Sequence, residues 1–227
     1  MKNYIIGLCI FIVGCTDTDI SLDVYNDVIQ ENGLTIIYPK FSKIDLVCGT
    51  MPNDSSVILV AEAAYTGKKL DEFEHSNIAG DHVANGVGYN GYDCPNNTGT
   101  FVYYNNQWKF CNDSSELDSA VLYNGAAFSQ ELIVKNGEIQ QTVRRNLDFS
   151  IYRALCEYDN RLCIIETQGI TTFGKFKKKL KEIDVDNAIY LDMGRGWNHS
   201  WYRTSKGVVE LHPKTHDYCT NWITFYK

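Results

Sequence analysis

Short apolar or alternating runs, each bounded by turn residues, dominate the hydrophobic pattern of the chain. Runs of about four to eight such residues are typical of β-strands. Asn-Asn, Asn-Gly and Asp-Asn pairs separate several of the runs, and such pairs form the tight turns of β-hairpins. The predicted strands cover 34–38, 44–48, 57–61, 100–104, 107–110, 126–128, 131–134, 150–156, 162–166, 188–191, 201–203, 208–211 and 222–226.

One segment has the period of a helix instead. Phe173, Phe176, Leu180 and Ile183 fall on one face at helical spacing, and lysines occupy the positions between them. The spacing predicts one main helix over about 171–183. Many hairpins and one helix indicate an α+β fold, in which a mostly antiparallel or mixed twisted sheet packs against that helix.

The last strand before the C-terminal hairpins ends in an acidic residue and a glycine loop. Asp192 follows the apolar run 188–191 directly, and Gly194, Arg195 and Gly196 come next. Strand ends of this kind collect ligands, because side chains there project from a rigid base. Glycines let backbone N–H groups approach a substrate closely, and an arginine adds a fixed positive charge. The alternative is an ordinary turn in which the aspartate is a capping residue.

A second acidic residue ends an apolar strand. Glu62 follows 57–61, a continuous apolar run of the kind that is buried on both faces. Burying a carboxylate is costly unless it is paired or functional, so Glu62 is a candidate site residue. The alternative is a solvent-facing glutamate at a sheet edge.

Residues 68–100 form a long stretch rich in Gly, Asn, His and Asp. Long loops in compact domains are commonly functional, and amide side chains suit sugar hydroxyls. His75, Asn77, His82 and Asn85 are therefore predicted to contact a substrate. Ordinary turn chemistry explains the same composition.

The N-terminal residues predict export. Residues 1–14 have a cationic start and an apolar run that is too short to span a bilayer, which is typical of a signal peptide. Ile12-Val13-Gly14-Cys15 is similar to the lipobox of bacterial lipoproteins, in which the cysteine becomes the lipid anchor. Residues 15–23 are then a polar tether and 24–227 one domain, held at the membrane in the periplasm or on the outer-membrane side. The alternative is an ordinary secretory signal in which Cys15 is incidental.

Composition narrows the function classes. The chain has 44% hydrophobic and 22% charged residues and a formal net charge of −7, which is ordinary globular composition and disfavours a nucleic-acid partner.

An even number of cysteines in an exported chain permits disulfides. Cys156 and Cys163 face each other if Asp159-Asn160 is a two-residue turn, although their register is less favourable for a bond. Neither metal nor cofactor is expected, since no cysteine and histidine spacing is typical of zinc. The six cysteines beyond the leader are Cys48, Cys94, Cys111, Cys156, Cys163 and Cys219.

The order of these segments resembles the phosphodiester glycosidase family, which includes the lysosomal uncovering enzyme that removes N-acetylglucosamine from mannose-phosphate diesters. An apolar strand runs into a small-residue aromatic segment, a leucine-containing strand runs into a glycine turn, and an arginine hairpin, a helix and an aspartate–glycine loop follow. The matching segments are 57–65, 131–137, 153–155, 161–165, 188–196 and Asn221. Two departures stand out: Glu62 replaces an asparagine of many members, and Met193 to Trp197 replaces a Gly-Gly-Gly-Ser run.

The resemblance implies hydrolysis of a sugar-1-phosphodiester or related glycoside. Asp192 and Glu62 supply the two carboxylates, with their individual roles left open, and Glu166 is a third candidate. Arg153 and Arg195 would neutralise the phosphate, although Arg153 can instead pair with Glu166 or Glu157 across a sheet.

Gly194, Gly196 and Trp197 complete the expected substrate contacts. A non-catalytic carbohydrate-binding envelope lipoprotein is the alternative, and a metal-dependent phosphodiesterase is a third possibility without a supporting ligand spacing.

Overall fold

The computed structural model describes residues 18–67, 72–194, 198–213 and 219–227. The predicted signal peptide and Cys15 lie outside the described residues, as do Arg195, Gly196 and Trp197. Export and lipid anchoring therefore stay predictions. Part of the predicted tether is a short strand, β1 (Asp19–Ser21).

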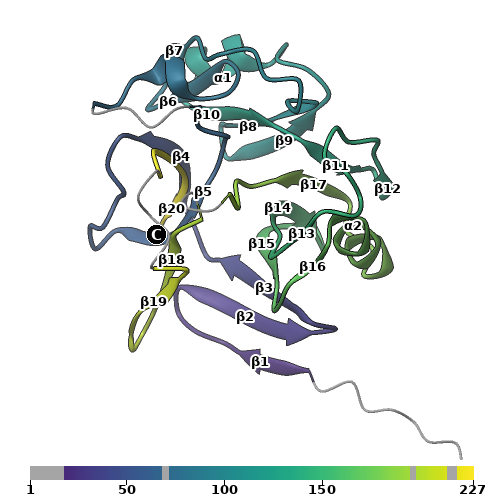
Figure 1. Ribbon diagram of the computed structural model, residues 1–227. Coiled ribbons are helices and arrows are strands. Elements are labelled where there is room, and N and C mark those ends of the chain that lie inside the picture. Colours follow the sequence, from purple (N-terminus) through teal and green to yellow (C-terminus); the bar gives the residue numbers. More distant parts are fainter. Residues whose placement is uncertain (1–17, 68–71, 195–197, 214–218) are drawn as a thin grey trace, which may run out of the picture.

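Three sheets make up most of the molecule (Figure 1). In the named pairs of strands, neighbours are antiparallel. The largest sheet has eight strands, in the order β1, β2 (Asn26–Glu31), β3 (Leu34–Pro39), β15 (Arg161–Thr167), β14 (Arg153–Tyr158), β17 (Asn187–Tyr190), β11 (Leu132–Lys135) and β12 (Glu138–Ile139).

Two five-stranded sheets and a small ribbon complete the strands. One sheet has the order β19 (Gly207–Leu211), β18 (Ser200–Thr204), β5 (Val57–Glu62), β20 (Asn221–Tyr226) and β4 (Lys43–Cys48). The other has the order β7 (Val87–Tyr89), β6 (His82–Ala84), β10 (Ala126–Gln130), β8 (Gly99–Tyr104) and β9 (Gln107–Cys111). β13 (Phe149–Ser150) and β16 (Thr171–Thr172) form the ribbon.

The predicted main helix is confirmed as α2 (Phe173–Glu182). It begins at Thr172, whose side chain accepts a hydrogen bond from the N–H of Lys175 at 3.2 Å, and such a cap satisfies an otherwise unpaired donor. Phe173, Phe176 and Leu180 are buried against the eight-stranded sheet. The other helices among the described residues are α1 (Leu117–Leu122) and the 3₁₀ turn η1 (His75–Asn77). Within the described ranges, no helix has the length and apolarity that a bilayer crossing requires.

The predicted α+β class is wrong, because the protein is a mostly-β fold. Strands account for 48% of it and helices for 10%, and α2 covers only part of one sheet. The stretch expected to be a long loop contains η1, β6 and β7, and residues 26–31 form β2. Strands of two or three residues are too short to show a hydrophobic period, so these elements escape a reading of the pattern.

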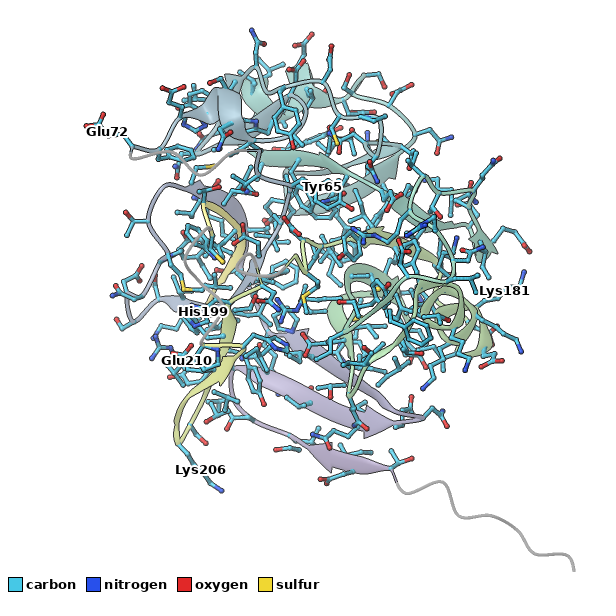
Figure 2. The ribbon with its side chains drawn as sticks, viewed as in Figure 1. Tyr65, Glu72, Lys181, His199, Lys206 and Glu210 are labelled. Carbon is cyan, nitrogen blue, oxygen red and sulfur yellow. The ribbon has the colours of Figure 1, made fainter. Side chains whose placement is uncertain are left out.

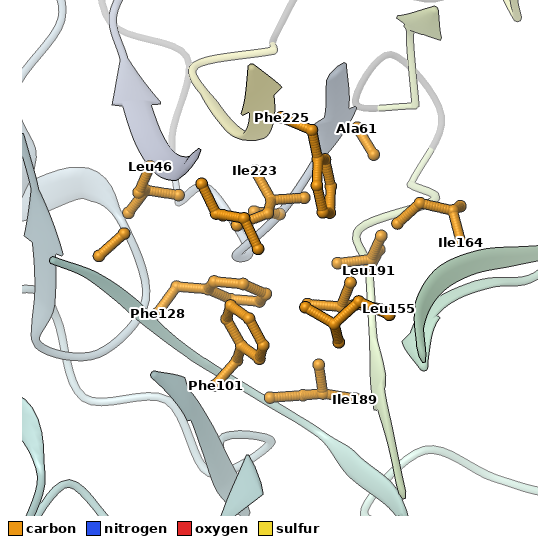
Figure 3. Close-up of a cluster of buried hydrophobic side chains, with 14 of the residues drawn as sticks. Leu46, Ala61, Phe101, Phe128, Leu155, Ile164, Ile189, Leu191, Ile223 and Phe225 are labelled. Atoms are coloured by element: carbon orange, nitrogen blue, oxygen red, sulfur yellow. The ribbon is translucent and has the colours of Figure 1, made fainter. Parts of the chain in front are cut away.

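The main core lies where the three sheets meet (Figure 3). β4, β5 and β20 contribute Leu46, Ala61, Ile223 and Phe225, β8 and β10 contribute Phe101 and Phe128, and β14, β15 and β17 contribute Leu155, Ile164 and Ile189. Because each sheet buries one face in this common cluster, the ends of β5 and β17 are held close together.

The predicted hairpin at Asp159-Asn160 is confirmed. Both residues have positive φ, at 55°, which the tight turn requires, and Cys156 pairs directly with Cys163 across β14 and β15. The two thiols remain free, however, and no disulfide joins the six cysteines within the described part of the chain. A directly opposite, hydrogen-bonded pair holds its backbones farther apart than a disulfide favours, which accounts for the unbridged pair.

Candidate active site

Two carboxylic acids meet where β5 and β17 end. Glu62 is the last residue of β5 and is fully buried, and Asp192 stands two residues after β17 and is 4% exposed. The N–H of Asp192 donates to the carbonyl of Ala63 at 3.0 Å, which links the two strand ends directly. The predicted strand-end carboxylates thus come together in one place, although they belong to different sheets.

Their surroundings shift both carboxyls toward the protonated form. Burial raises the pKa of Asp192 to about 7. Two groups lower it: the N–H of Gly194, which donates to Oδ1 of Asp192 at 2.8 Å, and the charge of Arg144. Burial, and then the negative charge of Asp192, raise the pKa of Glu62 well above its ordinary value. At neutral pH, Asp192 is therefore close to its midpoint, and the protonated form of Glu62 is favoured far more than in an exposed glutamate.

The two oxygens of the Glu62 carboxyl group differ in their hydrogen bonds. Its Oε1 accepts a hydrogen bond from the N–H of Thr220 at 3.4 Å. Its Oε2 is buried and has no hydrogen-bond partner among the described residues. A buried acid with one oxygen that makes no hydrogen bond is costly for the fold. Such an acid is suited to giving its proton to a bound group.

Asn221 shapes the loop that follows Glu62. Its Oδ1 accepts from the N–H of Ala64 at 2.8 Å, and its Nδ2 donates to the carbonyl of Ala64 at 3.0 Å. This double hydrogen bond, made from β20, fixes the backbone two residues after Glu62. Asn221 is one of the positions on which the family resemblance rests, and the structure gives it a positioning role.

Arg153 forms a buried ion pair with Glu166. The two residues stand opposite each other across β14 and β15, and the Nε and Nη2 atoms of Arg153 lie 2.8 and 2.5 Å from the same oxygen, Oε2, of Glu166. His212 contacts the other oxygen, Oε1, at 3.0 Å. Although burial opposes it, the charges of Arg153 and His212 hold the pKa of Glu166 below its ordinary value. Glu166 is therefore ionised, unlike Glu62.

A hydrogen-bond relay connects this ion pair to Glu62. Nη1 of Arg153 donates to the hydroxyl of Ser200, and the same hydroxyl accepts the N–H of Glu62 at 3.2 Å. The guanidinium also reaches the carbonyl of Asn198 at 3.3 Å. Arg153 and Glu166 thus support the backbone beneath the site, and the cross-strand pairing considered as an alternative for Arg153 is present.

Arg144 is a residue of the site that sequence reasoning missed. Its guanidinium lies 4.7 Å from the ring centre of Tyr190, its Nη2 donates to the hydroxyl of Tyr65 at 2.8 Å, and its Nε lies 3.6 Å from the carboxylate of Glu131. Figure 2 shows Tyr65 near the middle of the molecule. Unlike Arg153, the Arg144 side chain is 24% exposed, so it can reach a bound anion. The polar stretch before β13 contains no motif that marks this residue.

The four predicted loop contacts lie on η1, on β6 and in the turn that follows β6. His75 and His82 contact each other, with 2.9 Å between Nδ1 and Nε2. Asn85 has a positive φ and forms the turn between β6 and β7, and its N–H donates to Asp45 at 2.9 Å. The carbonyl of Asn77 accepts the N–H of Gly67 at 2.8 Å. Substrate contacts by these residues stay predictions, as do those of Arg195, Gly196 and Trp197 outside the described ranges.

The spacing of residues along the sequence also does not reveal one group of potential metal ligands. Cys48 lies beside His75 and His82, although it precedes them by more than a whole strand and loop. The expectation that no metal is bound depends on spacing along the chain, and the fold brings these three side chains together regardless of that spacing.

Taken together, the molecule is a mostly-β domain in which buried carboxyls converge at the junction of two sheets. A fold of this kind is found in a solved structure, the catalytic domain of zebrafish N-acetylglucosamine-1-phosphodiester alpha-N-acetylglucosaminidase auto-inhibited by its pro-peptide. The TM-score is 0.59 at 12% identity, over 93% of this chain and 83% of that chain. No family model and no curated protein matches the sequence. The likeness establishes a distant fold relationship and leaves family membership unproven.

Proposed function

We propose that the protein hydrolyses a glycosidic bond at Glu62 and Asp192, with sugar-1-phosphodiesters as the preferred substrates. The observation that carries the proposal is the meeting of two buried carboxyls, of which Asp192 has a pKa raised to about 7 and Glu62 a pKa raised well above its ordinary value. Environments that push two carboxyls to different pKa values are characteristic of acid–base pairs in glycoside hydrolysis. The fold shared with an N-acetylglucosaminidase domain adds support of a more general kind.

The different environments of the two acids assign their roles. Glu62 has the pKa raised by both burial and a neighbouring charge, so it is the group that donates a proton to the leaving oxygen. Asp192 ionises near pH 7, and in that form it either activates water or attacks the anomeric carbon. The N–H of Gly194 holds Oδ1 of Asp192 at 2.8 Å and so fixes the orientation of the carboxylate.

Arg144 is the described arginine best placed for a phosphate. Its charge acts on Asp192, and its side chain is partly exposed, whereas the fully buried Arg153 is occupied by Glu166 and Ser200. A phosphate is already a good leaving group, so neutralising its oxygens matters more than protonating them. Arg195, predicted as a second clamp, remains part of the proposal.

Turnover of a substrate panel tests the proposal. We expect the purified chain to release free sugar from an N-acetylglucosamine-1-phosphodiester of mannose, and more slowly from a chromogenic N-acetylglucosaminide. Activity should rise as the pH passes about 7, because Asp192 must lose its proton, and should fall at higher pH as Glu62 loses its own.

Two outcomes of the same panel contradict the proposal. Binding of the diester without release of sugar would favour the alternative, a carbohydrate-binding protein without activity. Turnover whose acidic limb stays near pH 4, the ordinary range of a carboxyl, would remove Asp192 from its assigned role.

A further inference from the structure

Three metal-ligating side chains converge outside the carboxyl site. Cys48 ends β4, His75 begins η1 and His82 begins β6, so each comes from a different element. One donor atom from each residue lies within 4.8 Å of the other two. In a tetrahedral zinc site, donor atoms stand about 3.3 to 3.7 Å apart, as the Zn–N and Zn–S bond lengths require. The donors are thus within roughly an ångström of that arrangement.

The hydrogen bonds of His82 turn the correct nitrogen toward the cluster. Its Nδ1 lies 3.1 Å from the carbonyl of Gly80, and since a carbonyl only accepts, Nδ1 carries the proton. Nε2 therefore has a free electron pair, and it faces Nδ1 of His75 at 2.9 Å. A backbone carbonyl that fixes the tautomer of a histidine in this way is the usual outer partner of a metal ligand.

The ring of His75 is held just as firmly. It stacks on Tyr89, with ring centres 3.4 Å apart and planes 4° from parallel, and it meets the edge of Phe73 at 5.0 Å. Beyond the rings, β4 and β6 are packed together, as Figure 1 also shows. The ligands therefore sit on supports that favour one geometry, and such preorganisation is a condition for tight metal binding.

We propose that Cys48, His75 and His82 bind one Zn²⁺ ion. One thiolate and two imidazoles suit a borderline-soft ion, and three protein ligands leave the fourth position to water. On binding, the thiol of Cys48 releases its proton to solvent, and His75 moves its proton from Nδ1 to Nε2 by exchange with water. No other bond changes.

The ion would tie together two sheets next to the carboxyl site. Cys48 belongs to the sheet of β5, and His82 belongs to the sheet of β6 and β10. Cys48 pairs with Asn221 on β20, and the next residue of that strand, Trp222, pairs with Glu62 on β5, so the zinc site lies close to the candidate acid without sharing its residues. The inference stands independently of the proposed hydrolysis.

Cobalt and zinc titration of the chelator-treated full chain tests the proposal. We expect one equivalent of Co²⁺ to bind, with the strong near-ultraviolet absorption of a thiolate–cobalt bond, and Zn²⁺ to displace it. Cys48→Ser should abolish that absorption, and His82→Gln should weaken zinc binding by more than about 100-fold, beyond the loss typical of an outer partner. Where Cys48→Ser fails to fold, His75→Gln serves in its place, because its ring is half-buried.

Matched control variants show whether zinc binding depends on other thiols, on other histidines or on the proposed hydrolysis. Cys111→Ser and His199→Gln should bind Zn²⁺ like the parent, since these residues lie on other strands and loops. Glu62→Gln should keep the ion while losing turnover. No stoichiometric uptake of Zn²⁺, uptake of Cu⁺ alone, or a cobalt spectrum that Cys48→Ser leaves unchanged would overturn the assignment.

Discussion

Asp192→Asn is expected to lower kcat about 100- to 10,000-fold, the range typical of losing a positioned acid or base. The amide has the shape of the carboxylate and can keep its oxygen on the N–H of Gly194. It cannot ionise, so the group that acts on water or on the anomeric carbon is removed while the loop is retained. Steady-state kinetics on the diester measure the loss, and Asp186→Asn, at an exposed position near β17, is the matched control.

The same variant should be more stable than the parent at pH 8. The pKa of Asp192 is raised from 3.8 to about 7, so the folded state holds a proton that the unfolded state has released. The resulting stability is complete below about pH 4 and is lost as the pH rises to about 7. The loss amounts to about 4 kcal/mol, which the asparagine does not incur. A variant that is both inactive and less stable at pH 8 would contradict this account.

Arg153→Leu should destabilise the protein by about 3 to 5 kcal/mol, because it leaves the buried carboxylate of Glu166 without its main partner. His212 retains one contact with Glu166 but cannot replace the two-point pairing. The relay through Ser200 to the backbone of Glu62 is lost at the same time. Urea denaturation at pH 7 measures the change in the free energy of unfolding.

Two further variants show whether the loss of stability in Arg153→Leu comes from the unpaired charge of Glu166. Arg161→Leu removes an arginine from the neighbouring strand β15 that is 48% exposed and 3.5 Å from Asp27, and it should cost less than about 1 kcal/mol for the lost ion pair. The double change Arg153→Leu with Glu166→Leu should recover part of the stability, since no buried charge remains. Equal losses for Arg153→Leu and Arg161→Leu would show that the buried pair contributes nothing special.

Much of the fold could be predicted from local signals. The hairpin at Asp159-Asn160 and the helix at 173–182 both follow from a few neighbouring residues, and both are present. The fold class could not be predicted in the same way. β1, β6 and β7 have three residues each, and strands so short owe their existence to their partners in the sheet.

Some residues of the candidate site could likewise be predicted from local sequence signals, and others could not. Glu62 and Asp192 could be found because each ends an apolar run, and a carboxylate in that position needs an explanation. Arg144 and Ser200 could not, since their relation to the carboxyls depends on contacts between distant segments. The cluster of Cys48, His75 and His82 escaped for the same reason, because ligands from three elements have no fixed spacing.

The central claim is that Glu62 and Asp192 form a buried pair that holds a proton near neutral pH. Titration of the side-chain carboxyl carbons by NMR, in the parent and in Asp192→Asn, tests it most directly. We expect Asp192 to titrate near pH 7 and Glu62 well above the ordinary range of a glutamate, and the pKa of Glu62 to fall when the neighbouring charge is removed. Titration of both groups near pH 4 in the folded parent, as in solvent-exposed carboxyls, would contradict the account.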